Sequence, residues 1–212
     1  MKALGQTALL LAFGVCAFAQ QWEVGGLGGG SFLDRVSVKT PTAGSATAKF
    51  GPGPVAGAFF GQRMSPHWSG EIRYEFFDTN LKLKSGGTTA SFNGYAHAVH
   101  YDLLYHTGRK HAPVQFFVAA GGGMKVFEGT GLQEAFQPLS QFGYFTQTHQ
   151  IKPMASVGGG LIFNLGSKAA FRAEIRDFIS GFPTKVIAPA QSATYGKVLN
   201  DIVPMVGVSY LF

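Results

Sequence analysis

Two short runs of charged residues are the features of the sequence most able to do chemistry. In each run the charges occupy every second position, which places them on one face of an extended strand. The first run is Glu71, Arg73 and Glu75, and the second is Arg172, Glu174 and Arg176. Buried charges are tolerated when they are paired and hydrogen-bonded. If the two strands face each other at matching levels, the predicted ion pairs are Glu71–Arg172, Arg73–Glu174 and Glu75–Arg176.

Other arrangements that would support catalysis or metal binding are weak. His97 and His100 are three residues apart, so on a strand they face opposite sides and cannot hold one ion together. The sequence has no His-Glu-x-x-His motif, no phosphate-binding loop and no nucleophile elbow. We therefore expect no enzyme activity, no catalytic residues, no metal and no cofactor.

The composition indicates which elements must position these charges. Hydrophobic residues make up 46% of the 212 residues and charged residues only 13%, about half of the roughly 25% found in an average soluble domain. The 30 glycines and the aromatic fraction of 14% are typical of strands and tight turns. Such a chain is too apolar to be disordered and has too few charges to coat a soluble surface.

The N-terminus has the pattern of a secretory signal peptide. Lys2 precedes an apolar stretch at 8–19 that is too short to span a bilayer as a helix, and Ala17-Phe18-Ala19 has the form of a cleavage site. We expect residues 1–19 to be removed and residues 20–212 to form one domain. Lipid modification at Cys16 is a weaker alternative, because Val15 is bulkier than such a site normally accepts.

The mature chain must be held together without a disulfide. No second stretch of 18 apolar residues is present, which excludes a helical membrane anchor and leaves a closed β-barrel as the structure that satisfies its backbone in lipid. Such a barrel needs segments that alternate apolar and polar residues. About eight segments are predicted as strands, near residues 21–32, 55–63, 68–78, 92–106, 114–127, 152–164, 171–176 and 200–212. The first two are rich in glycine, and their sequence leaves open which residues face which side.

Long and short connections alternate between these segments. The long ones, 33–50, 81–90, 128–149 and 180–198, are polar, and the short ones, 64–67, 107–112 and 165–168, are rich in turn residues. Outer-membrane barrels have this asymmetry, with short periplasmic turns and longer outer loops. An even number of strands places both termini on the periplasmic side. A soluble barrel of the lipocalin type would also alternate, so it remains an alternative.

The last segment ends in Tyr210-Leu211-Phe212, with aromatic or apolar residues at alternate positions before the end. With this ending, a signal peptide, eight strands and four long loops, the chain resembles the small outer-membrane barrels of the outer-membrane protein A and X type, without their peptidoglycan-binding domain. In that family the final strand is the signal read by the barrel-assembly machinery, and Val208, Tyr210 and Phe212 match it. The resemblance implies an all-β fold, a closed antiparallel eight-stranded transmembrane β-barrel in the bacterial outer membrane.

The interior of such a barrel is just wide enough for side chains to fill it. We therefore predict a column of ion pairs and hydrogen bonds that plugs the lumen. Glycine runs at 121–123 and 158–160 fit this prediction, because a missing side chain in mid-strand permits close packing. The predicted members of the column are Glu71, Arg73, Glu75, His100, Asp102, Lys125, Lys152, Arg172, Glu174 and Arg176.

The long loops suggest partners outside the cell. The aromatic residues of loop 128–149 predict a surface contact or, as the alternative, packing at the membrane interface or of the loop on itself. The net charge of +6 favours outer-membrane lipid and lipopolysaccharide as partners, although the loop lysines look scattered and solvated; nucleic acid is excluded by location. The aromatic residues are Phe136, Phe142, Tyr144 and Phe145, and the lysines are Lys39, Lys49, Lys82, Lys84, Lys185 and Lys197.

The predicted function is therefore non-enzymatic: envelope structure, or surface interaction through the loops, by a barrel with a plugged lumen. Three alternatives remain. One is a small porin-like channel. Another is a barrel enzyme acting on outer-membrane lipid, although such relatives carry a His-x-Ser motif at the outer rim and the match here, His67-Trp68-Ser69, lies at the short connection 64–67. The third is a soluble periplasmic lipocalin-like binder.

Overall fold

The computed structural model describes residues 21–33, 35–40, 44–108, 112–130, 137–190, 193–196 and 198–212, and every regular element in these ranges is a β-strand. The predicted signal peptide at 1–19, Phe136 and Lys197 lie outside the described residues. No helix in the described ranges is long and apolar enough to cross a membrane.

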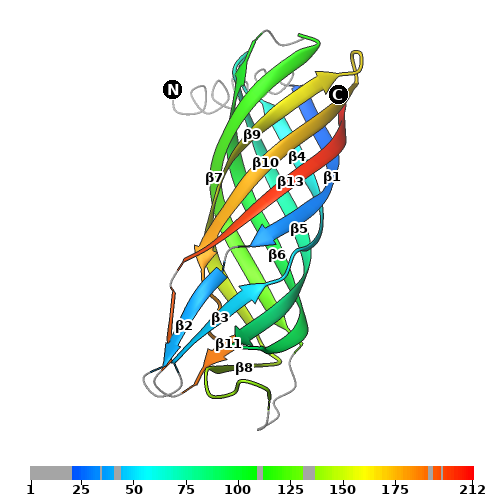
Figure 1. Cartoon of the computed structure of the whole chain (residues 1–212). Helices are drawn as coiled ribbons and strands as arrows, with labels where there is room; N and C mark the ends of the chain where they lie inside the picture. Colours follow the sequence, from blue (N-terminus) through cyan, green and yellow to red (C-terminus); the bar gives the residue numbers. More distant parts are fainter. Residues whose placement is uncertain are drawn as a thin grey trace, which may run out of the picture.

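Eight antiparallel strands pair side by side and close into a ring (Figure 1). Strand β13 pairs with both β10 and β1, which completes the ring, and the backbones of Trp22 and Phe212 exchange hydrogen bonds of 2.9 and 3.0 Å at the junction. The predicted eight-stranded barrel is confirmed. In ring order its strands are β1 (Gln21–Leu33), β4 (Gly53–Arg63), β5 (Trp68–Ser85), β6 (Thr88–Thr107), β7 (Val114–Gly129), β9 (His149–Asn164), β10 (Ala169–Gly181) and β13 (Val198–Leu211).

The connections differ at the two ends of the barrel, as the sequence predicts. At the end where β1 begins and β13 ends, the connections are short, and Gly108 and Gly166 adopt φ values of 108° and 111° that favour glycine. At the opposite end, the connections contain further strands: β2 (Arg35–Thr40), β3 (Gly44–Phe50), β8 (Gly143–Phe145), β11 (Ile187–Pro189) and β12 (Thr194–Tyr195). We call these two ends the short-turn end and the long-loop end.

The prediction of a long polar loop at 81–90 is wrong. Strands β5 and β6 continue through this segment and meet at a tight turn containing Gly86, whose φ is 56°. Leu81 and Leu83 are fully buried and alternate with Lys82 and Lys84, so the segment is an amphipathic strand whose polar half gave it the composition of a loop.

The extended β5–β6 hairpin forms the base of a structure that stands beyond the ring, and we call this structure the outer extension. Strand β3 pairs with β5 beyond the end of β4, β2 pairs with β3, and β12 pairs with β2 (Figure 1). Strands β8 and β11 form a separate two-stranded sheet. The long connections thus have backbone hydrogen bonds of their own.

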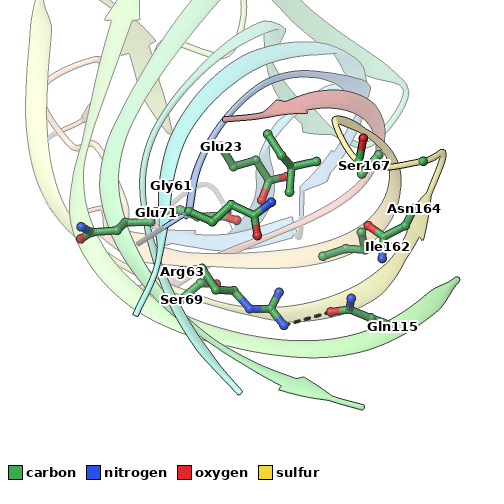
Figure 2. Close-up of a pocket in the computed structure, with 14 residues that line it drawn as sticks. Glu23, Gly61, Arg63, Ser69, Glu71, Gln115, Ile162, Asn164 and Ser167 are labelled. Carbon is green, nitrogen blue, oxygen red and sulfur yellow. Dashed lines mark hydrogen bonds between the residues drawn. The ribbon is translucent and has the colours of Figure 1, made fainter. Parts of the chain in front are cut away.

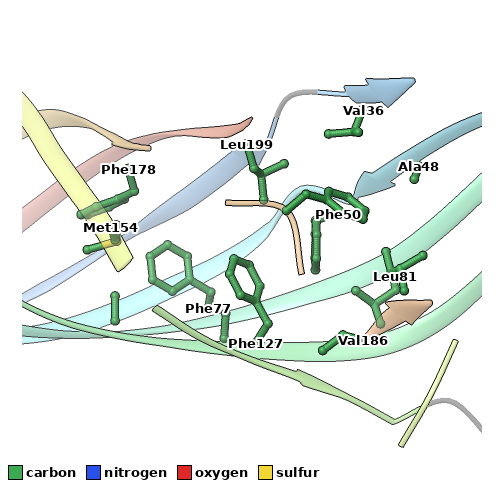
Figure 3. Close-up of a cluster of buried hydrophobic side chains, with 14 of the residues drawn as sticks. Val36, Ala48, Phe50, Phe77, Leu81, Phe127, Met154, Phe178, Val186 and Leu199 are labelled. Carbon is green, nitrogen blue, oxygen red and sulfur yellow. The ribbon is translucent and has the colours of Figure 1, made fainter. Parts of the chain in front are cut away.

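Alternation along the strands gives the barrel two different faces. The outward face is apolar: Ile72, Val99, Val118, Ile175 and Val206 each expose between 46% and 54% of their surface. The inward face is charged in the half near the short turns and apolar toward the long loops. Figure 3 shows the apolar part, which we call the apolar cap; it includes Phe50, Phe77, Leu81, Phe127, Met154, Phe178, Val186 and Leu199.

Glycine makes room for the inward side chains. A Cβ on Gly121 would overlap the carbonyl oxygen of Tyr101 and the carboxylate of Asp102, and a Cβ on Gly160 would lie 2.8 Å from the Cα of Glu174. The glycine runs therefore stand where charged neighbours on the next strand need the space, in agreement with the predicted close packing.

We predict that Gly121→Ala lowers the free energy of unfolding by about 1–3 kcal/mol, because the added methyl group overpacks the lumen against Asp102. The matched control is Gly28→Ala, where the Cβ has no neighbour closer than the carbonyl oxygen of Val55 at 4.0 Å. Urea titration of both variants in lipid vesicles measures the difference. Equal stability of the two variants would show that the lumen is loosely packed.

Candidate functional site

The candidate site is the column of charged side chains in the lumen near the short turns. Strands β5 and β10 are separated by three strands in either direction around the ring, so they face each other across the lumen. Arg172 donates two hydrogen bonds to the Glu71 carboxylate, at 2.6 and 2.9 Å. Arg73 binds Glu174 with an Nη2–Oε1 distance of 2.5 Å. These contacts join the two charge runs, and each is one of the predicted ion pairs.

The predicted pair Glu75–Arg176 does not form. Arg176 instead donates to Asp102 at 2.6 Å, while Glu75 accepts from the Nε of Arg73 at 2.9 Å and lies 2.8 Å from His100 Nε2. The prediction assumed that each residue meets its partner at its own level. Long arginine side chains also reach along the barrel axis, so a guanidinium can bind a carboxylate at another level that lies closer to it.

A further pair lies above these contacts, toward the apolar cap. Lys125 Nζ lies 2.7 Å from an Asp201 carboxylate oxygen, and the other oxygen accepts a hydrogen bond from Ser31. The same ammonium lies 3.9 Å from the centre of the Phe77 ring, where a cation–π attraction adds to the ion pair. This pair links the charged column to the apolar cap.

His100 joins two carboxylates. Its Nδ1 lies 2.9 Å from Asp102, and its Nε2 lies 2.8 Å from Glu75. A neutral imidazole donates only one hydrogen bond, so the charged form satisfies both contacts. With His100 charged, five cations face five fully buried anions in the column, and the partly exposed Glu23 carboxylate lies 3.8 Å from Arg172 at its short-turn end. The cations are Arg73, His100, Lys125, Arg172 and Arg176, and the anions are Glu71, Glu75, Asp102, Glu174 and Asp201.

This balance matters because the column is almost completely withdrawn from solvent. Its ten side chains expose no more than 2% of their surface. Aromatic rings flank the arginines: the guanidinium of Arg172 lies 4.4 Å from the ring centre of Phe59 and 5.1 Å from that of Phe117. Each charge therefore depends on its neighbours rather than on water.

Lys152 is the predicted member of the column that stays outside it. It is half-buried, occupies the register position opposite Lys125, and forms no ion pair with a described residue. Asp201 is the member that the prediction missed. Its position was visible in the sequence, because it shares the alternating face of Gly207 and Ser209 on the last strand.

The mouth of the lumen at the short-turn end contains one small cavity (Figure 2). Its volume is about 30 Å³, which is room for about one water molecule. Arg63 crosses this mouth and donates to Gln115 at 3.1 Å. The cavity leads directly onto Glu71, the first residue of the ion column.

A serine and a histidine meet just inside this mouth and were not singled out from the sequence. Ser69 Oγ lies 2.7 Å from His106 Nε2, and His106 Nδ1 has no hydrogen-bond partner among the described residues. A serine nucleophile of the triad type needs a third group that orients the histidine. No group of three or more potential metal ligands occurs among the described residues either.

The aromatic residues of loop 128–149 divide into two kinds. Phe142 and Phe145 are 2% and 1% exposed and pack in the apolar cluster of the long-loop end, whereas Tyr144 is 43% exposed. Phe142 and Phe145 are thus unavailable as surface contacts, and the prediction is wrong for these two residues. They pack inward against other elements instead: the Phe145 ring centre lies 4.8 Å from that of Phe92 on β6.

The three residues of the predicted assembly signal on the last strand point outward at the short-turn end. Val208, Tyr210 and Phe212 are 62%, 48% and 59% exposed, and the rings of Tyr210 and Phe212 stack with centroids 6.3 Å apart. Their exposed, apolar row is compatible with recognition by assembly machinery, which stays a prediction.

Comparison with known proteins identifies this architecture. No protein-family model and no curated protein matches the sequence. Among solved structures, the outer membrane protein OprG from Pseudomonas aeruginosa gives a TM-score of 0.58 at 14% identity over 91% of this chain and 95% of OprG. Neisserial surface protein A gives 0.55 at 11% identity over 90% and 96% of the two chains. The outer membrane protein AlkL, solved in lipid bilayers, gives 0.50 at 15% identity over 91% and 90%.

The chain has the fold of these outer-membrane β-barrels. Its apolar outward face therefore contacts lipid, which excludes the soluble lipocalin-like alternative. The short-turn end is periplasmic, and the outer extension is extracellular. At these identities the likeness concerns the fold, and function must be argued from the site.

We predict that Arg172→Glu lowers the free energy of unfolding by about 3–5 kcal/mol, because it leaves Glu71 without its buried partner and adds a fourth carboxylate beside Glu23, Glu71 and Glu174. Adding Glu71→Arg in the same chain should recover part of the loss. Urea unfolding in vesicles provides the measurement.

The exchange of Glu75 and Arg176 supplies the matched control. Because these two side chains bind other partners, Glu75→Arg combined with Arg176→Glu should show no recovery relative to the single variants. Recovery in this control but not at positions 71 and 172 would contradict the observed pairing.

Proposed function

We propose that this barrel is a non-enzymatic, non-conducting membrane anchor that presents its outer extension at the cell surface, for envelope structure or surface interaction. The observation that carries the proposal is the double obstruction of the lumen. The ion column fills the periplasmic half, and the apolar cap fills the extracellular half. A solute would have to pass both.

Neither obstruction is easy to move. An ion entering the column must separate charge pairs at low dielectric, where each unpaired charge costs several kcal/mol. Beyond the column it meets the rings of Phe77, Phe127 and Phe178, all at most 1% exposed. The rings and aliphatic side chains of the apolar cap cannot replace a hydration shell, and few hydroxyl groups, such as those of Thr79 and Ser180, lie among them. This supports a closed barrel over the porin-like alternative.

The enzyme alternative has little support from the residues. Ser69 lines a cavity with room for about one water molecule, and the described residues provide no carboxylate that orients His106. The described residues thus provide no complete catalytic constellation at this pair.

The outer extension has the construction expected of such a surface. Its sheet is continuous with the barrel wall, and its inner face is fixed by the apolar cap, including Val36, Ala48 and Phe50 (Figure 3). A rigid platform loses less conformational entropy on binding than free loops do. We therefore infer that the ordered outer face, rather than a mobile loop, makes the contacts.

We predict that the purified protein, folded in planar lipid bilayers, shows no stable conductance above the lipid background. The physical reason is the paired and dry lumen described above. A heat-dependent shift in gel mobility would confirm that the sample is folded. Stable, open channels in the folded protein would overturn the proposal in favour of the porin-like alternative.

A further inference from the structure

The outer face of the outer extension carries a group of lysines that are distant in sequence. Strands β2, β3 and the extended parts of β5 and β6 form one sheet, whose inner face contributes Val38, Ala48 and Leu83 to the apolar cap. The lysines alternate with these buried residues, so they stand on the opposite face. They are Lys39, Lys49, Lys82 and Lys84, and we call them the basic face.

Strand register brings the charges together. Lys49 lies directly opposite Lys82 on β5, and Arg35 holds the position opposite Lys49 on β2. Lys84 is the next outward residue on β5 after Lys82. Adjacent strands are about 4.8 Å apart, so Lys49 and Lys82 stand next to each other on neighbouring strands. The lysines that look scattered in the sequence are neighbours in the sheet.

These charges are not neutralised within the described part of the molecule. None of the four lysines forms an ion pair with a described residue. Strands β2 and β3 have no acidic residue, and on β5 the nearest is Asp78, four residues from Lys82. Like charges directly opposite each other destabilise a sheet. A bound anion would remove that cost.

The remaining outward positions suit an anion with many oxygen atoms. They carry hydroxyl groups, which donate hydrogen bonds, and they lie beside the lysines in the same register rows: Thr47 is opposite Lys84, and Ser91 is opposite Lys82. Further hydroxyls come from Ser37, Ser45 and Thr89. Lysine is a strong point-charge partner for phosphate.

The position of the basic face limits the source of the anion. On β5 the outward residues change from lipid-facing Ile72, Tyr74 and Phe76 to Asp78 and then to Lys82. Lys82 lies six residue steps beyond Phe76, which corresponds to about 14 Å along the membrane normal for a strand tilted by about 45°. The basic face therefore looks sideways into the headgroup layer of the outer leaflet, rather than upward from a loop tip.

We propose that the basic face binds the phosphorylated saccharide of lipopolysaccharide in the surrounding outer leaflet. This inference rests on the proposed role of the outer extension as the interacting part of the barrel. The lysines and hydroxyls hold the phosphate groups, and the lipid chains of the same molecule pack against the apolar wall below. The barrel thereby orders its own lipid neighbours.

The test measures binding of deacylated lipopolysaccharide core oligosaccharide, with its phosphates, to the full-length mature protein in nanodiscs. The double variant Lys49→Gln and Lys82→Gln should raise the Kd at least tenfold. The matched control, Lys168→Gln and Lys185→Gln, removes the same charge at exposed positions away from the basic face and should change the Kd less than twofold. The same oligosaccharide without its phosphates should not bind.

Each other outcome is informative. Equal Kd values for the two double variants would overturn the assignment of this face. Binding of a sulfated polysaccharide such as heparin, without binding of the oligosaccharide, would overturn the lipid source and indicate an extracellular glycan. Both double variants should remain folded and non-conducting. Open channels would contradict the proposed function but not the basic face. Unchanged binding of the oligosaccharide by a closed barrel would contradict the basic face but not the proposed function.

Discussion

A charged side chain inside this barrel is surrounded by other charged groups instead of water. The membrane requires a closed ring of strands, because lipid offers no partner for free backbone groups, and the ring sends half of all strand residues inward. With eight strands the lumen is filled by side chains. The ten charges of the ion column are paired with one another in this confined space, with five of each sign when His100 is protonated. The Nε groups of Arg172 and Arg176 donate to no described residue. The neutral, hydrogen-bonded column is the condition on which the rest of the structure depends.

Several features of the strands follow from that condition. Glycine occupies positions such as 121 and 160, where a neighbouring Asp102 or Glu174 needs space. Aromatic rings of Phe59 and Phe117 flank the Arg172 guanidinium, so it remains dry without losing favourable electrostatics. Toward the long-loop end the interior becomes apolar, so the apolar cap can anchor the long connections. The same alternation of inward and outward residues that buries the charges in the lumen places the lysines of the outer extension on its outer face.

The sequence predicts much of this because its signals are periodic. Alternation with a period of two identified the eight strands and the inward face of nearly all the predicted column, and charge complementarity identified the contacts of Arg172 and Arg73. The limits are physical as well. The predicted ion pair Glu75–Arg176 was wrong because arginine side chains reach along the barrel axis, and the alternation of inward and outward residues does not describe that reach. Asp201 was missed, although its alternating position places it on the same face of the last strand as Gly207 and Ser209. Segment 81–90 was predicted to be a loop because half of its residues are polar. The basic face depends on the register between β2, β3 and β5, and a pattern within one segment does not contain that information.

The central claim is that charges from opposite walls are directly bonded across a dry lumen. Solid-state NMR of the protein in lipid bilayers, with arginine ¹⁵N and glutamate and aspartate ¹³C labels, measures these contacts directly. The account predicts through-space correlations from the Arg172 guanidinium to the Glu71 carboxyl, from Arg73 to Glu174 and from Arg176 to Asp102, with no exchange of these protons with water. Guanidinium groups that exchange rapidly with water and show no carboxylate correlation would contradict it.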